Sequence, residues 1–224
     1  MKIKITDLEQ QLNEKIKRNT QSIGLDIAER TGICIITTDE THVDLDWQFI
    51  EFDKTSIESV YENMFKEFSK IIIKEKDKDN MVVIEDTFLQ RFGKFVQADV
   101  FKKLTRFGTI ALVCSFLNEM PYEFILAKSA RSKLKIKMIA GEPKKSVSSY
   151  LYNQLDIEVD DNDIADAIVL AILGLIDGLD FRSNATILKI KKAEKKKAEK
   201  LVIKEAKKAE RLAIKEAKKK AKGK

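Results

Sequence analysis

Hydrophobic and polar positions in the first quarter of the chain predict a small antiparallel sheet. Residues 22–27 form one short apolar run, and residues 32–38 form a second that is rich in β-branched side chains. Residues 42–52 alternate apolar and polar positions, which is typical of a strand with one buried face. Three strands joined by such short turns predict an antiparallel meander.

The pattern then changes from a period of two to a helical period. Residues 56–74 carry apolar side chains three and four apart, which predicts an amphipathic helix. Residues 81–85 (MVVIE) read as a short buried strand of the parallel kind. Residues 88–118 are expected to be mostly helical, 122–127 to form a fifth strand, and 163–179 to form an apolar helix.

This order of elements, βββαβαβα, predicts an α/β domain of the ribonuclease-H-like arrangement. The mixed five-stranded sheet would combine the antiparallel three-strand meander with parallel strands and be flanked by helices. We expect residues 1–20 to form an N-terminal amphipathic helix and residues 21–186 to form the main domain. Residues 187–224 are expected to form a basic C-terminal helical tail.

Charge is divided unevenly between the body and the tail. The net charge of the chain is +6, but residues 187–224 hold seventeen Lys and Arg and five Glu. The other 186 residues hold 25 basic and 31 acidic side chains. The tail contains an 11-residue near-repeat, at 200–210 and 211–221, which keeps its few apolar positions on one helical face. We therefore expect a partly solvated helix that adds non-specific nucleic-acid binding. The alternative is a helix for solubility or partner binding that does not touch DNA.

Composition excludes several classes of protein. No apolar run approaches the ~18 residues of a membrane span, and the N-terminus lacks the apolar region of a signal peptide, which predicts a cytoplasmic protein. Cys34 and Cys114 lie in apolar runs, where cysteine behaves as a small buried hydrophobe. With His42 as the one histidine, a zinc site is not expected. Any chemistry must rest on carboxylates, lysines and hydroxyls.

Two acids close predicted strands. Asp26 follows Ile23 and Leu25 in the first strand, and Glu85 ends the apolar run MVVIE. Ligands collect at the carboxyl ends of strands in open α/β sheets. The alternatives are an end-of-strand Asp that accepts backbone hydrogen bonds and an exposed Glu just past its strand. Asp86 is expected to lie on the opposite face.

Asp163 and Asp166 stand three residues apart and therefore share one face of the predicted last helix. N-capping could account for one acid among Asp160, Asp161 and Asp163, because acids stabilise the first turn of a helix. It does not account for Asp166, which lies in a helix that is otherwise almost entirely apolar.

Four acids without histidine or cysteine form a hard-oxygen site, which suits Mg²⁺ or Mn²⁺. If the fold is right, Asp26, Glu85, Asp163 and Asp166 converge in one cleft. Two such ions in a carboxylate site activate water and stabilise the leaving oxygen in phosphodiester hydrolysis.

The sequence resembles RuvC-type Holliday-junction resolvases, and most of all divergent bacteriophage members. The matching motifs are GLDIAERTG around Asp26, VVIEDTF around Glu85, and DNDIADAIVLAI around Asp163 and Asp166. Asp26 and Glu85 are 59 residues apart, and the acidic pair follows 78 residues later, in keeping with that family. The resemblance implies a ribonuclease-H-like fold and a homodimer that cuts four-way DNA junctions with Mg²⁺ during recombination and repair.

The same resemblance implies roles for individual residues. The four acids would be the catalytic metal ligands, and Phe88 would contact unstacked bases at the junction centre. The alternative for Phe88 is ordinary core packing. Among the basic residues before the last helix, Lys133, Lys144 and Lys145 are the expected phosphate contacts, with a solvated charged face as their alternative.

We therefore expect a Mg²⁺-dependent, structure-selective DNA endonuclease that makes paired nicks in four-way junctions. One alternative is another ribonuclease-H-like nuclease, which would cut an RNA strand or act like a transposase. The other alternative is a non-catalytic, basic-tailed nucleic-acid-binding protein whose acids are helix caps and surface groups.

Overall fold

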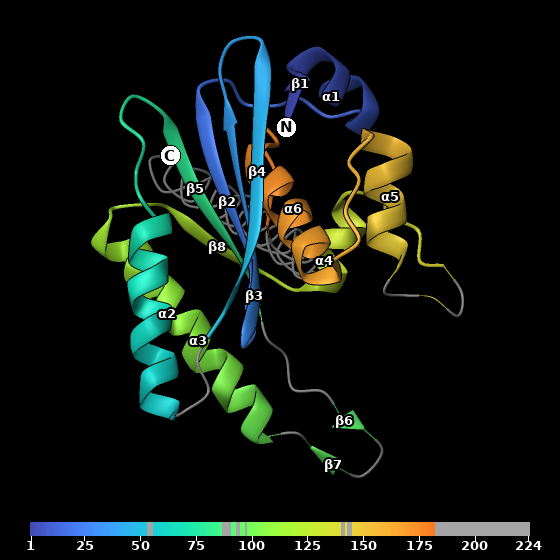
Figure 1. Ribbon diagram of the computed structural model, residues 1–224. Helices are drawn as coiled ribbons and strands as arrows, with labels where there is room; N and C mark the ends of the chain where they lie inside the picture. The colour runs from blue at the N-terminus through green and yellow to red at the C-terminus, as the bar shows by residue number, and fades with distance from the viewer. Residues whose placement is uncertain are drawn as a thin grey trace, which may run out of the picture. The chain divides into compact units, whose positions relative to one another are not determined.

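In the computed structural model, the described residues are 1–52, 56–86, 91–92, 95–96, 98–139, 142 and 145–181. Met1–Phe181 form one compact unit (Figure 1). Arg182–Lys224 form a second unit, which lies outside the described residues. The expectation of a helical tail therefore stays a prediction.

The described unit is built on a six-stranded mixed sheet with the order β1-β4-β3-β2-β5-β8. β2, β3 and β4 pair antiparallel, as the predicted meander requires, and β5 and β8 continue the sheet parallel to β2. The strands are β1 (Lys2–Lys4), β2 (Thr20–Asp26), β3 (Arg30–Thr38), β4 (His42–Glu51), β5 (Asp79–Glu85) and β8 (Tyr122–Ile125). The expected mixed sheet is confirmed.

The N-terminal segment differs from the expected single helix. Lys2–Lys4 form the edge strand β1, which pairs antiparallel with β4, and the helix α1 spans only Ile5–Leu12. A three-residue strand is too short to show an alternating pattern, so the sequence did not reveal the sixth strand. α1 ends at Asn13, whose left-handed backbone (φ 54°) is a common way for a helix to stop.

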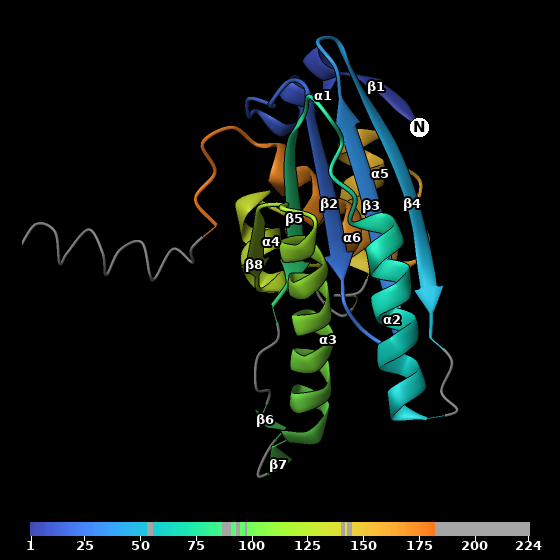
Figure 2. The same ribbon diagram turned by 90° about the vertical axis from the view of Figure 1, so that its left-hand side faces the viewer.

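Helices cover both faces of the sheet (Figures 1 and 2). α2 (Ile57–Ile71) and α3 (Ala98–Leu117) lie on one face. On the other face lie α1, α5 (Lys145–Leu155) and α6 (Asn162–Leu175), with α4 (Ala127–Lys133) beside α6. The expected helix over 88–118 begins later, since the short strands β6 (Arg91–Phe92) and β7 (Phe95–Val96) precede α3.

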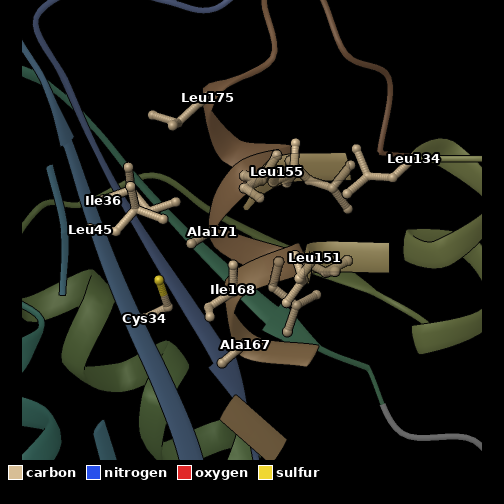
Figure 3. Close-up of a cluster of buried hydrophobic side chains, with 14 of the residues drawn as sticks. Cys34, Ile36, Leu45, Leu134, Leu151, Leu155, Ala167, Ile168, Ala171 and Leu175 are labelled. Carbon is tan, nitrogen blue, oxygen red and sulfur yellow. The ribbon is translucent and has the colours of Figure 1, made fainter. Parts of the chain in front are cut away.

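The two-residue period of the strands divides the core into two clusters. Ile23 and Leu25 of β2 pack toward α2 and α3. On the opposite face, Cys34, Ile36 and Leu45 face α6 (Figure 3). Both cysteines are buried free thiols, as the sequence predicted, and burial raises the pKa of each thiol above its usual range.

Two glycines let α6 lie directly on the sheet. A Cβ atom on Gly24 of β2 would overlap the carbonyl oxygen of Ala167, and one on Gly32 of β3 would overlap that of Asp163. Glycine is the residue that permits such close backbone approach. The start of α6 is therefore held against the ends of β2 and β3.

Within the described residues, the helices are all too short or too polar to cross a membrane.

Candidate active site

Asp26 and Glu85 end neighbouring parallel strands. β2 and β5 pair in register up to Leu25 and Ile84, so the next residues, Asp26 and Glu85, lie side by side. Leu25 and Ile84 both face the α2–α3 layer, and successive side chains in a strand point to opposite faces. Asp26 and Glu85 therefore face α6. Asp86 follows the strand and is exposed, outside this pair.

α6 brings the second pair of acids to the same place. Its N-cap is Asp161, whose carboxylate accepts hydrogen bonds from the backbone N–H groups of Asp163 (2.9 Å) and Ile164 (3.1 Å). The capping alternative therefore holds for Asp161 and leaves the side chains of Asp163 and Asp166 for another role. Gly32, which is opposite Asp26 in β3, lies against the backbone of Asp163.

The four acids act on one another. The pKa of Asp26 is raised well above its usual range, first by burial and then by a hydrogen bond to Glu85. The negative charges of Glu85, Asp166 and Asp163 raise it further. The other three carboxylates are thus close enough to Asp26, at the end of β2, to act on its charge. Their role as a metal site stays a prediction.

Two arginines neutralise part of this charge. Arg131 of α4 holds Asp166 with two hydrogen bonds, Nε to Oδ1 at 3.2 Å and Nη2 to Oδ2 at 2.6 Å. Arg30 at the start of β3 donates to Asp163 (3.0 Å) and to the cap Asp161. Burial lowers the pKa of Arg131, but the Asp166 hydrogen bonds and the charges of Asp166, Glu85 and Asp26 outweigh that effect and raise it.

Sequence reasoning missed the role of both arginines. Arg131 belongs to the basic segment that was expected to face phosphates, and Arg30 follows Asp26 by four residues. The available signal was the acids themselves, because partly buried carboxylates need nearby cations.

The chemistry of the donor set fits a hard divalent cation. The cluster offers only carboxylate oxygens, the ligands that Mg²⁺ and Mn²⁺ prefer, and its mutual repulsion would be relieved by positive charge. The metal site is not preformed. In the described part of the chain, no group of three His, Cys, Asp or Glu side chains is arranged so that it could hold a metal ion. Asp163 and Asp166 face guanidinium groups instead.

The expected phosphate contacts have different surroundings. Lys133 donates to the backbone carbonyl of Asp180, whereas Lys145 is exposed and paired with Glu142 at 3.2 Å. Lys145 also lines a groove of about 500 Å³ that runs along α5 to Asp160 and Asn162, at the start of α6. Phe88 and Lys144 lie outside the described residues, so their roles stay predictions.

Comparison with solved structures identifies the fold. Thermus thermophilus RuvC in complex with a Holliday-junction substrate superposes with a TM-score of 0.54 at 13% identity, over 68% of this chain and 90% of that one. The chain shares its fold with RuvC. A second Thermus thermophilus RuvC structure gives 0.50 at 13% identity, over 68% of this chain and 91% of that one. The expected ribonuclease-H-like fold is confirmed.

A third similar structure is the yeast mitochondrial Holliday-junction resolvase Ydc2, with a TM-score of 0.42 at 14% identity, over 73% of this chain and 81% of that one. No protein-family model matches the sequence, and no curated protein matches it.

Proposed function

We propose that this protein is a divalent-metal-dependent, structure-selective DNA endonuclease that resolves four-way junctions. The observation that carries the proposal is geometric: Glu85 lies beside Asp26 in the sheet, and the first turn of α6, with Asp163, packs against Gly32 opposite Asp26. The fold shared with RuvC, one of whose structures holds a Holliday-junction substrate, supports the choice of substrate.

Each acid has a defined part in this proposal. Asp26 and Glu85, fixed by the strand register, would hold Mg²⁺ or Mn²⁺ from the sheet, and Asp163 and Asp166 would hold it from α6. When bound, the metal supplies Lewis-acid activation of water and charge stabilisation at the leaving oxygen. The sheet and α6 hold the acids on rigid elements, which keeps their geometry fixed during the reaction.

Branched DNA would approach along the exposed face of α5. Lys145 and the groove between Lys145 and Asn162, which reaches the start of α6, offer a path for a phosphate backbone. Lys133 and Lys144 belong to the same proposed contact region, although the Lys133 ammonium already binds the Asp180 carbonyl. Phosphate contacts of this kind position the substrate without reading its sequence.

A homodimer follows from the symmetry of the substrate. A four-way junction is two-fold symmetric and needs two nicks, for which a closed two-fold dimer is the natural form. Phe107 of α3 is fully buried against α2 and belongs to the core, so it is not available for an interface. The exposed large apolar side chains of the same helix are Val100, Val113, Phe116 and Leu117.

The decisive experiment compares substrates under single-turnover conditions. A synthetic four-way junction, a linear duplex of the same sequence and an RNA–DNA hybrid are each incubated with the full chain in Mg²⁺ or in EDTA. We expect paired, symmetric, Mg²⁺-dependent nicks in the junction alone. Preferential cutting of the hybrid or of linear duplex ends would favour another ribonuclease-H-like nuclease, and binding without cutting would favour a non-catalytic DNA-binding protein.

The basic tail gives a prediction about affinity. A chain that ends at Thr186 loses the seventeen Lys and Arg of residues 187–224 and none of the four acids. If the tail contacts duplex phosphates, each lost contact should make the slope of log K against log salt shallower by about 0.9. We expect weaker junction binding at low salt, a shallower slope and an unchanged cleavage rate at saturation. Fluorescence anisotropy over a salt series measures the first two, and an unchanged affinity and slope would exclude tail–DNA contact.

A further inference from the structure

Arg131 lies inside the acid cluster rather than at its rim. Its side chain is 25% exposed and that of its partner Asp166 is 18% exposed. The charges of Glu85 and Asp26 also act on the guanidinium. One arginine thus interacts with three of the four acids, from a helix, α4, that precedes α6 by about thirty residues of sequence.

The pair has the geometry of a strong, specific contact. Nε and Nη2 each donate to a different oxygen of Asp166, at 3.2 and 2.6 Å. This fork-to-carboxylate arrangement is the one that arginine forms best, and lysine cannot reproduce it. Both oxygens of Asp166 are therefore used by the guanidinium.

A divalent ion shared by Asp166 and Asp26 would bind the same carboxylate that Arg131 holds. It would stand ~2.0–2.1 Å from a carboxylate oxygen, closer than the guanidinium nitrogens stand now. Its two positive charges would also repel the Arg131 side chain at that range. Metal and guanidinium therefore compete for Asp166, because each cation disfavours the other at this range.

We propose that Arg131 is a built-in counter-cation of the site. It holds Asp166 in the metal-free protein, is displaced when a divalent ion binds, and so lowers the affinity of the site for the ion. This inference rests on the proposed function, because it requires the four acids to be the metal site.

Arg30 does not share this position. It is held at the rim by Asp161, Asp163 and Glu51, and its guanidinium stacks over the ring of Phe49 at 4.1 Å. Asp161 is the helix cap, fixed by its hydrogen bonds from the backbone of α6, and we expect it to keep Arg30 at the rim when metal binds. Among the described residues Arg131 has Asp166 as its one ion-pair partner, so the loss of that contact frees it.

The first test measures Mg²⁺ binding without DNA, by isothermal titration calorimetry. Arg131→Gln should bind Mg²⁺ about tenfold more tightly than the unaltered chain, which corresponds to ~1.4 kcal/mol. In EDTA the same variant should melt at a lower temperature, since Asp166 loses its counter-cation. Equal or weaker Mg²⁺ binding by Arg131→Gln would overturn the inference. Should that variant fail to fold, Arg131→Lys keeps the charge but loses the two-pronged contact with Asp166. It should also bind Mg²⁺ more tightly than the unaltered chain, and unchanged Mg²⁺ affinity would overturn the inference.

The chain offers a matched control in the pair of Arg18 and Glu9. Arg18 holds both oxygens of Glu9, at 3.0 and 3.2 Å, with side chains 33% and 26% exposed. Arg18→Gln should lower the melting temperature and leave Mg²⁺ affinity unchanged. A rise in Mg²⁺ affinity equal to that of Arg131→Gln would mean that net charge alone is responsible, which would overturn a specific role for Arg131.

A second readout reports the displacement itself. In nitrogen-edited NMR spectra, the Nε–H signal of Arg131 should shift or exchange faster with solvent when Mg²⁺ is added. The reason is that the ion binds the Asp166 carboxylate, which accepts the hydrogen bond from Nε–H in the metal-free protein. The guanidinium signals of Arg18 should stay constant. An Arg131 signal that does not respond to saturating Mg²⁺ would overturn the inference. If neither the unaltered chain nor Arg131→Gln binds Mg²⁺, the metal site and the proposed function fail together, whereas binding that is equal in both refutes the inference alone.

Discussion

Exchange of Glu85 for glutamine should reduce junction cleavage by about a thousandfold, equal to ~4 kcal/mol of transition-state stabilisation. Glu85 ends β5 beside Asp26, and its charge helps to raise the pKa of Asp26, so the two carboxylates are neighbours in the proposed site. Glutamine keeps the size and the hydrogen-bonding ability of the side chain but removes the charge that would hold the metal. The fold should remain intact, because the substitution also removes a repulsion between neighbouring carboxylates.

Asp86→Asn is the matched control for this substitution. Asp86 is the next residue, carries the same charge and is exposed after the end of the strand. Single-turnover cleavage in Mg²⁺ and junction binding in EDTA, measured for both variants, separate chemistry from affinity. We expect Asp86→Asn to cut normally and Glu85→Gln to bind normally without cutting. Cleavage by Glu85→Gln at more than a tenth of the unaltered rate would contradict the proposed role of Glu85.

The acids could be predicted from sequence because their surroundings conflict with their charge. Asp26 and Glu85 end apolar strands, and Asp166 lies in a helix of buried side chains. A strand places its residues on two faces in strict alternation, so the register of β2 and β5 determines which acids meet. The order of the elements then determines that α6 covers the same face as those acids.

The arginines could not be predicted in the same way. An arginine side chain is long and has several rotatable bonds, so its position in the chain does not fix where its guanidinium lies. Arg131 was one of several basic residues in its segment, and only the packing of α4 against α6 shows that it reaches Asp166. Lys133, two residues later, donates instead to a backbone carbonyl.

The shortest strands could not be predicted from the sequence either. β1 has three residues, and β6 and β7 have two each. Periodicity needs several repeats before it distinguishes a strand from a helix or a loop. β1 therefore appeared as part of the N-terminal helix, and the β6–β7 pair appeared as part of α3.

Gly32→Ala should both destabilise the protein and impair its site. The added Cβ would overlap the backbone carbonyl of Asp163, which lies in the first turn of α6 and cannot rotate away as a flexible side chain could. Overpacking of this kind costs about 1–3 kcal/mol, which lowers the melting temperature by roughly 2–12 °C for a domain of this size. The start of α6 must move away from β3, and a displacement of ~1 Å at a reacting group can cost about a hundredfold in rate.

Gly108→Ala provides the comparison. Gly108 lies in α3 on the other face of the sheet, where the nearest atom to an added Cβ is Cε1 of Phe124 at 3.4 Å. Alanine is favoured over glycine in a helix by ~1 kcal/mol, so this variant should melt at the same temperature or higher and cut junctions at the unaltered rate. Thermal melts and single-turnover cleavage of both variants test the difference. If Gly32→Ala behaved like Gly108→Ala in both measurements, the close approach of α6 to β3 would not be what positions Asp163 and Asp166 beside Asp26.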